Sequence, residues 1–158
     1  MNNFISSLLL FILLLSCSDN SQKIGTQNVY DNENLFTKEE RKELSKLIYN
    51  CEKSGDIQVL VLTVSDYGKY QNIEDYAINM GNVLGVGNKI DNNGLVMVIS
   101  NEKREVRIEP GTGLKEKLSS DSLQKVIDDK MIPYCVKGEF FLATTNVINA
   151  LCFNVSNQ

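Results

Sequence analysis

The sequence predicts an α/β fold, a Rossmann-like three-layer sandwich in which helices cover both faces of a small sheet. Two apolar segments, residues 57–64 and 95–99, have the composition of strands buried on both faces. Amphipathic helical patterns lie before, between and after these segments. A buried strand, a helix and a second buried strand in one domain imply a right-handed βαβ crossover with parallel strands. The chain of 158 residues has room for one such domain.

The first predicted helix begins at a capping box, residues 37–40 (TKEE). In this motif the side chains of Thr37 and Glu40 each accept a hydrogen bond from the other residue's backbone N–H. Apolar residues then recur at helical spacing as far as Cys51, and residues 54–56 (SGD) end the helix.

The remaining elements alternate with turn sequences along the chain. Residues 105–109 (EVRIE) alternate polar and apolar side chains, which is typical of a strand with one wet face, and a tight turn makes it the antiparallel partner of the strand before it. Pro133 is expected to stop the third helix. The predicted helices after the first span residues 73–84, 120–132 and 139–151.

The N-terminal segment predicts export. The apolar run 8–15 (LLLFILLL) is far shorter than the roughly 20 residues that cross a bilayer, and it fits a signal peptide. The sequence LLSC at residues 14–17 resembles the lipobox of bacterial lipoproteins, which implies acylation of Cys17. A plain signal peptide or a buried N-terminal helix is the alternative. Our predicted organisation is a lipoprotein signal peptide at 1–16, a lipidated N-terminus and flexible tether at 17–34, the domain at 35–153 and a tail at 154–158.

Charge and composition exclude several functions. The net charge is −4, which argues against a nucleic-acid partner because phosphate binding needs a basic face. The chain contains no histidine, which removes Ser-His-Asp and Cys-His catalysis and histidine-ligated zinc. No fingerprint for an organic cofactor is present: the stretch GVGNKI at residues 85–90 lacks the third glycine and precedes a strand.

Three cysteines remain after Cys17, and each lies at an apolar-face position of a predicted helix. We interpret Cys51, Cys135 and Cys152 as small buried hydrophobic residues. An oxidising compartment would permit one disulfide and leave one thiol over, so a disulfide stays open as the alternative.

Several short segments match one family in its order and spacing. They are the strand at 59–64, EDYA at 74–77, GVG at 85–87, NG at 93–94, REVRIEPGTGL at 104–114, IPY at 132–134 and GEF at 138–140. Together, from about residue 30 to 151, they resemble the TPM domain, also called the thylakoid-lumen acid-phosphatase-like domain. The resemblance implies an extracytoplasmic Rossmann-like sandwich, acid-phosphatase activity in a plant member, calcium binding in some members, and roles beside membrane protein complexes.

The predicted topology brings two loops to the edge of the sheet where its parallel strands begin. One loop holds Asp91, Asn92 and Asn93, and the antiparallel strand delivers Glu109 and the loop of Gly111, Thr112 and Gly113 to the same edge. These oxygen donors suit Ca²⁺ or Mg²⁺. The family usually has Asp-Asn-Gly where this chain has NNG at 92–94, with Asp91 one position earlier. The alternative is that both loops are plain turns. The amides of Gly111 and Gly113 could also hold an anion at the following helical turn.

The predicted function follows from these candidates. The carboxyl ends of the parallel strands, at Ser65, Asp66, Ser100 and Asn101, form the edge where open α/β sheets usually bind ligands. The sequence has no nucleophile motif of a phosphatase, so only water activated by a metal, with Asp91 or Glu109 as base, would support hydrolysis. We therefore expect an interaction module, anchored at the membrane of a bacterial cell envelope and facing the periplasm or the surface. Its expected partner is an envelope membrane protein, and a metal-dependent acid phosphatase is the alternative.

Overall fold

The computed structural model describes residues 28–55 and 57–156. The predicted signal peptide, Cys17 and residues 18–27 lie outside the described residues. The elements in chain order are β1 (Val29–Asp31), α1 (Lys38–Gly55), β2 (Gln58–Thr63), α2 (Ile73–Leu84), β3 (Gly94–Ser100), β4 (Glu105–Pro110), a 3-10 turn (Thr112–Leu114), α3 (Ser120–Val126), a π-helical segment η2 (Ile127–Met131), α4 (Ile132–Cys135) and α5 (Phe140–Ser156).

The four strands form one mixed sheet in the order β1-β2-β3-β4. Strand β2 runs parallel to both neighbours, and its pairing with β3 joins Val59 to Leu95 and Thr63 to Ile99. Strand β4 returns antiparallel to β3 and places Glu109 opposite Val96. The predicted parallel pair and the antiparallel hairpin strand are both confirmed.

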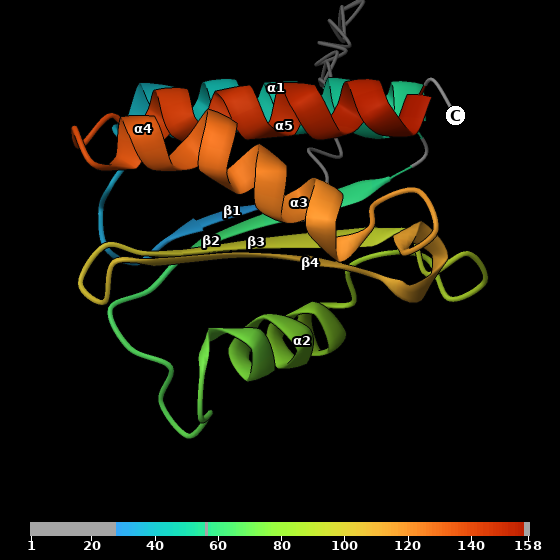
Figure 1. Ribbon diagram of the computed structural model, residues 1–158, viewed down its shortest axis with the longest axis horizontal. Coiled ribbons are helices and arrows are strands. Elements are labelled where there is room, and N and C mark those ends of the chain that lie inside the picture. Colours follow the sequence, from blue (N-terminus) through green and yellow to red (C-terminus); the bar gives the residue numbers. More distant parts are fainter. Residues whose placement is uncertain (1–27, 56, 157–158) are drawn as a thin grey trace, which may run out of the picture.

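Helices cover both faces of this sheet, which confirms the predicted three-layer sandwich. Figure 1 shows α1, α3, α4 and α5 on one face and α2 alone on the other. The larger core joins side chains such as Leu44, Val61 and Ile148, each at most 1% exposed. The smaller core lies under α2 and includes Leu62, Val98 and Ala77. Alternate residues of β2 and β3 point to opposite faces, so burial of both faces explains their continuous apolar sequences.

Strand β1 corrects the predicted tether. We expected residues 17–34 to lack regular structure, but residues 29–31 pair with β2 at the edge of the sheet, and Val29 is buried. A strand of three residues is too short to show an alternating pattern in the sequence, so only its pairing with β2 identifies it.

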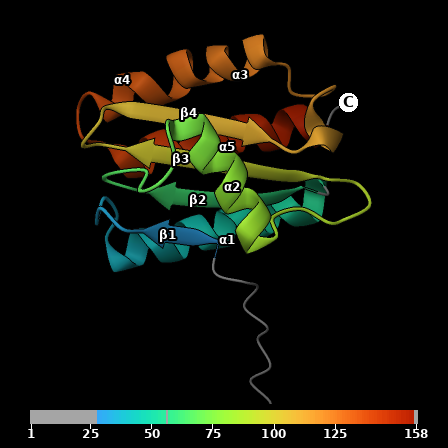
Figure 2. The ribbon, with the colours of Figure 1, turned by 90° about the horizontal axis from the view of Figure 1, so that it is seen from below.

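The two βαβ crossovers, β1-α1-β2 and β2-α2-β3, have opposite hand. The chain moves across the sheet in one direction in both, while α1 and α2 lie on opposite faces (Figure 2).

Pro133 does not end the third helix, contrary to our prediction. The helix continues through η2 into α4, and Pro133 lies in the first turn of α4. Proline has no N–H, and its ring collides with the carbonyl four residues earlier in an ideal α-helix. The wider π-helical turn at 127–131 accommodates this residue, with the Ile132 N–H donating to the Ile127 carbonyl. Helix α5 also continues to Ser156, so residues 154–156 of the predicted tail are helical.

A disulfide joins Cys51 of α1 to Cys152 of α5, with the Cα atoms 5.5 Å apart. Our interpretation of both residues as unpaired hydrophobic packing is therefore wrong. The helical pattern placed Cys51 correctly in the core, where it is 4% exposed. Which cysteines meet depends on how α1 packs against α5, and no local pattern reports that. Cys135 stays a free, half-buried thiol, and burial raises its pKa.

Candidate functional site

The two loops of the predicted cation site meet where the parallel strands begin. The Gly111 N–H donates to the Gly94 carbonyl at 2.7 Å, and the Gly113 N–H donates to the Asn92 carbonyl at 3.2 Å. A Cβ atom at Gly113 would collide with the carbonyl oxygen of Asp91. Glycine is therefore required here by the close approach of two backbones. The structure places the 91–93 loop directly against the 111–113 loop.

Asn88 organises the first of these loops. Its Oδ1 accepts hydrogen bonds from the N–H groups of Ile90 (2.9 Å) and Asp91 (2.6 Å), and its Nδ2 donates to the Asp91 carboxylate at 2.6 Å. The Asn88 N–H in turn donates to the side chain of Asn93, which is 5% exposed. Asn92 adopts a φ of 47°, in the left-handed region that asparagine tolerates well. Asn88 was not among the predicted site residues, although asparagine commonly forms turns by accepting a hydrogen bond from the N–H two residues on, as it does here from Ile90.

The Glu109 carboxylate forms an ion pair with Arg107. The Arg107 guanidinium donates to it at 2.6 Å and also contacts Glu74 of α2 at 3.2 Å. The Glu109 side chain is only 13% exposed, so water screens this ion pair weakly. Glu109 could bind a cation or act as a base only if Arg107 released it. Within residues 28–55 and 57–156, no three or more His, Cys, Asp or Glu side chains form a group that could hold a metal ion.

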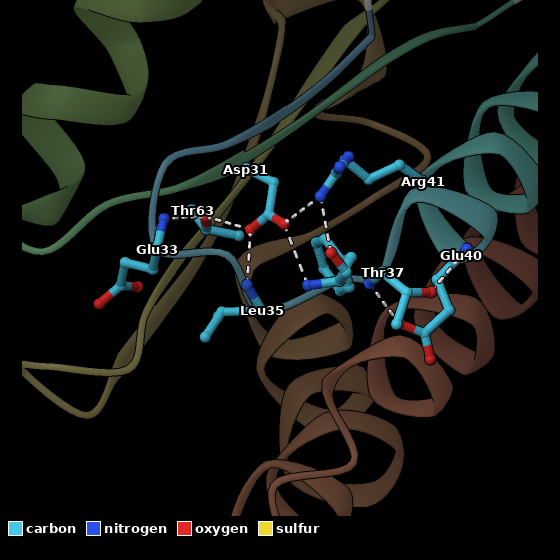
Figure 3. A network of polar contacts seen from close by, with 8 residues as sticks. Asp31, Glu33, Leu35, Thr37, Glu40, Arg41 and Thr63 are labelled. Carbon is cyan, nitrogen blue, oxygen red and sulfur yellow. Dashed lines mark hydrogen bonds and ion pairs between the residues drawn. The ribbon is translucent and has the colours of Figure 1, made fainter.

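At the opposite edge a buried carboxylate ties β1 to the start of α1 (Figure 3). The Asp31 side chain is 1% exposed and pairs with Arg41 at 3.1 Å. Its two oxygens also accept hydrogen bonds from the N–H groups of Leu35 and Phe36 and from the Thr63 hydroxyl. We did not predict this network, because residues 18–34 read as a polar tether. Its full complement of partners indicates a structural role.

The carboxylates of Glu33 and Glu105 also accept hydrogen bonds at this edge. The Glu33 carboxylate accepts the N–H groups of Asn101 (2.9 Å) and Glu102 (3.1 Å), so it holds the β3–β4 turn. The Tyr67 hydroxyl donates to Glu105 at 2.8 Å. Burial, followed by the neighbouring Glu105 carboxylate, raises the pKa of Tyr67 to about 12. Tyr67 therefore stays a neutral hydrogen-bond donor at physiological pH.

A pocket of about 620 Å³ opens beside the β3–β4 turn. One wall comes from the ends of β3 and β4, with Ser100, Asn101 and Val106, and the other comes from α4 and the start of α5, with Ile132, Val136 and Phe140. The sequence predicted a ligand edge at Ser100 and Asn101, and the structure adds the apolar wall. Val136 lines this pocket and is 79% exposed.

These features define a class of protein: a three-layer α/β domain with tight backbone loops at one sheet edge and an apolar pocket at the other. The profile of the TPM domain matches residues 29–152, and the chain belongs to the TPM domain family. The resemblance seen in its sequence motifs is thus confirmed. No curated protein matches the chain.

Solved structures share the fold. The N-terminal domain of a protein from P. gingivalis is 26% identical, with a TM-score of 0.74 over 84% of this chain and 83% of that one. The BA42 protein of Bizionia argentinensis is 18% identical, with a TM-score of 0.69 over 80% and 85%. The N-terminal domain of the cg2496 protein of Corynebacterium glutamicum is 14% identical, with a TM-score of 0.65 over 84% and 82%. Among the described residues, no helix is long and apolar enough to span a membrane.

Proposed function

We propose that this TPM domain is an interaction module of the bacterial cell envelope, tethered to the membrane by a lipid on Cys17 and docking on an envelope membrane protein. The Cys51–Cys152 disulfide carries the proposal, because disulfides persist in oxidising compartments outside the cytoplasm. The lipobox-like LLSC at residues 14–17 supports the same location independently. Two or more acyl chains would anchor the domain stably where one chain would exchange.

A divalent cation, Ca²⁺ or Mg²⁺, would bind at the Asp91 edge. The first donors are the Oδ1 of Asp91, since Asn88 bonds the other oxygen, and the hydroxyl of Thr112, with water completing the shell. The carbonyls of Asn92 and Asn93 already accept hydrogen bonds from the N–H groups of Gly113 and Gln58. Glu109 would join only after exchanging Arg107 for the cation. Hard oxygen donors with so little charge favour weak binding, about 10⁻⁴–10⁻³ M, as in extracellular calcium modules.

The acid-phosphatase alternative needs a general base beside a bound metal. Glu109 is a poor base while its carboxylate is paired with Arg107, and Asp91 already accepts a hydrogen bond from Asn88. These contacts favour the interaction module over the hydrolase. Turnover of p-nitrophenyl phosphate that copurifies with the wild-type chain and disappears in Asp91→Ala would reverse this preference.

Detergent phase partitioning of the full chain, expressed in a bacterium with lipoprotein processing, tests the anchor. Wild type should enter the detergent phase, and Cys17→Ser should remain an uncleaved precursor. Cys135→Ser is the matched control, because it removes a free thiol and leaves the lipobox intact. Recovery of wild type entirely in the aqueous phase would refute the anchor. Cross-linking of wild type in intact membranes, compared with the Cys17→Ser protein, then tests for a membrane-protein partner.

A further inference from the structure

The pocket beside the β3–β4 turn is walled mainly by apolar side chains. Val106, Cys135 and Phe140 line it and also pack against the larger core, so the pocket lies on the face of the sheet that carries α4 and α5 (Figure 1). Ile132 and Val136, four residues apart on one helical turn, are 40% and 79% exposed. The volume of about 620 Å³ equals roughly 20 water volumes, which suits a small organic molecule.

Arg104 carries the charge of this pocket that has no partner within the described part of the chain. Only Arg104 and Glu105 are charged among the residues that line it. The Glu105 carboxylate accepts the Tyr67 hydroxyl at 2.8 Å, and Tyr67 belongs to the smaller core on the opposite face of the sheet. The Nζ of Lys103 lies 5.4 Å from the centre of the same ring. Among residues 28–55 and 57–156 the Arg104 guanidinium forms no ion pair, so it is available to a ligand.

The backbone of Arg104 adopts a conformation that arginine seldom takes. Its φ is 57°, and its N–H donates to the Asn101 carbonyl at 3.3 Å within the β3–β4 turn. Glycine or asparagine would adopt the left-handed region at lower cost. Backbone strain of this kind concentrates at binding sites, where the surrounding structure holds a side chain in place. Recognition of a ligand therefore explains an arginine at this position better than folding does.

One guanidinium beside an apolar wall favours a ligand that has one negative charge and an apolar body. A carboxylate carries one charge and accepts two parallel hydrogen bonds from a guanidinium. The Asn101 side chain also lines the pocket and would supply a further N–H donor. A phosphate monoester carries nearly two charges at neutral pH and would leave part of its charge unpaired here. The pocket therefore fits a monocarboxylic acid better than the substrate of a phosphatase.

We propose that this pocket binds a small amphipathic acid, with its carboxylate on Arg104 and its apolar body between Val106 and α4. Ile132 and Val136 would cover that body and remove its surface from water. The cation loops lie at the opposite edge of the sheet, and the pocket does not depend on a lipid at Cys17. The inference therefore adds a ligand to the domain and goes beyond the proposed function.

Alkylation of Cys135 measures whether the pocket is occupied. This free thiol lines the pocket, and burial raises its pKa, so the full chain in phosphatidylcholine vesicles is treated with N-ethylmaleimide at about pH 8.5. The disulfide keeps Cys51 and Cys152 from reacting, and peptide mass spectrometry distinguishes Cys135 from Cys17. Phenylbutyrate at about ten times its Kd should slow the alkylation about tenfold, because only the empty pocket exposes the thiol.

Related compounds test each half of the ligand. Phenylbutyramide lacks the charge and butyrate lacks the ring, and each should bind at least about tenfold more weakly than phenylbutyrate. Equal protection by the acid and its amide would overturn the role of Arg104. Better protection by phenyl phosphate, or by a peptide with a free C-terminal phenylalanine, would overturn the small acid in favour of a phosphatase substrate or a protein C-terminus. An alkylation rate unchanged by phenylbutyrate and decanoate alike would overturn the site.

Arg104→Asn should change stability and binding in opposite directions. Asparagine relieves the left-handed backbone and removes the charge, so the melting temperature should rise while the affinity for phenylbutyrate falls at least about tenfold. Arg104→Lys keeps a positive charge and should retain part of the affinity. An Arg104→Asn protein that is less stable than wild type and binds the acid equally well would show a structural role and overturn the proposal.

Two exposed valines locate the ligand on the molecule. Val136→Asp places a negative charge on the pocket wall and should weaken phenylbutyrate binding at least about tenfold. Val83→Asp is the matched control, because Val83 is 72% exposed on α2 at the other face of the sheet and should bind the acid as wild type does. Equal effects of the two substitutions would overturn the placement of the ligand at α4.

Discussion

At the scale of single residues, the two neighbouring threonines of α5 differ in how they are satisfied. Thr144 is fully buried, and its hydroxyl donates to the Phe140 carbonyl at 2.8 Å. The Thr145 hydroxyl oxygen is also buried, and within the described residues it has no hydrogen-bond partner. A buried polar group left unpaired costs free energy that its apolar isostere does not.

Thr145→Val should therefore raise the free energy of unfolding by about 1 kcal/mol. Thr144→Val is the matched control, since it removes a satisfied hydroxyl and should be neutral or destabilising. Urea denaturation of both variants measures the difference. A Thr145→Val protein that is less stable than wild type would show that its hydroxyl has a partner in solution.

Tyr67 gives a prediction about pH. Its raised pKa, to about 12 from the ordinary 10.0, means that unfolding lowers the pKa and that the unfolded chain ionises first. The contribution of Tyr67 to stability is complete below pH 10 and declines as pH rises toward 12. The difference in ultraviolet phenolate titration between wild type and Tyr67→Phe should report this ionisation. Glu105→Gln should move it toward lower pH, because the neighbouring negative charge is gone. An unmoved titration in Glu105→Gln would contradict the assigned contact.

At the scale of elements, the loops at 88–93 and 111–113 depend on each other. Their backbones are joined at Gly113, and the proposed cation ligands come from both loops. A cation bound to the native state alone adds RT ln(1 + [L]/Kd), or about 1.4 kcal/mol at ~10 times Kd.

Millimolar Ca²⁺ should raise the melting temperature of wild type by about 3–6 °C. Asp91→Ala should lose this shift. Glu109→Gln should lose less of it, because Glu109 begins paired with Arg107. Asp66→Ala is the control, since Asp66 lies at the opposite edge and caps its own turn at Gly68. Equal melting temperatures with and without Ca²⁺ or Mg²⁺ would contradict the cation site and show that both loops are plain turns.

At the scale of the whole molecule, the disulfide closes the largest loop of the domain. Cys51 and Cys152 are 101 residues apart, so the bond joins the first helix to the last and the loop that it closes contains the strands β2, β3 and β4. In the chain-entropy account, closing so long a loop restricts the unfolded chain by about 4–5 kcal/mol, and measured values for native disulfides are about 2–5 kcal/mol.

Cys152→Ser should lower the free energy of unfolding by about 2–5 kcal/mol under oxidising conditions. Treating wild type with a reductant should produce a loss of similar size, while the Cys152→Ser protein should not respond. Cys135→Ser, which leaves the disulfide in place, should retain wild-type stability and its sensitivity to reductant. Denaturant curves with and without reductant give all of these values. An oxidised wild type no more stable than Cys152→Ser would contradict the prediction.

The sequence alone determined the fold class, the family, the two buried strands and the start of α1. Each rests on local physics: continuous apolar runs report strands buried on both faces, and the Thr37–Glu40 capping box reports contacts within one helical turn. It also identified which loops would meet at the Asp91 edge, because parallel strands fix which strand ends lie together. The prediction of a lipid on Cys17 depends on the sequence alone, because that residue lies outside the described part of the structure.

Only the tertiary structure decided which side chains already have partners within the folded chain. The pairing of Cys51 with Cys152, the burial of Asp31 and the ion pair between Glu109 and Arg107 all depend on how the folded chain packs. A residue's type and spacing show what it can bind, but its partners are set by contacts across the folded chain. A cysteine on an apolar helix face packs as a hydrophobic residue or forms a disulfide according to the neighbouring helix, and α5 is that neighbour for α1.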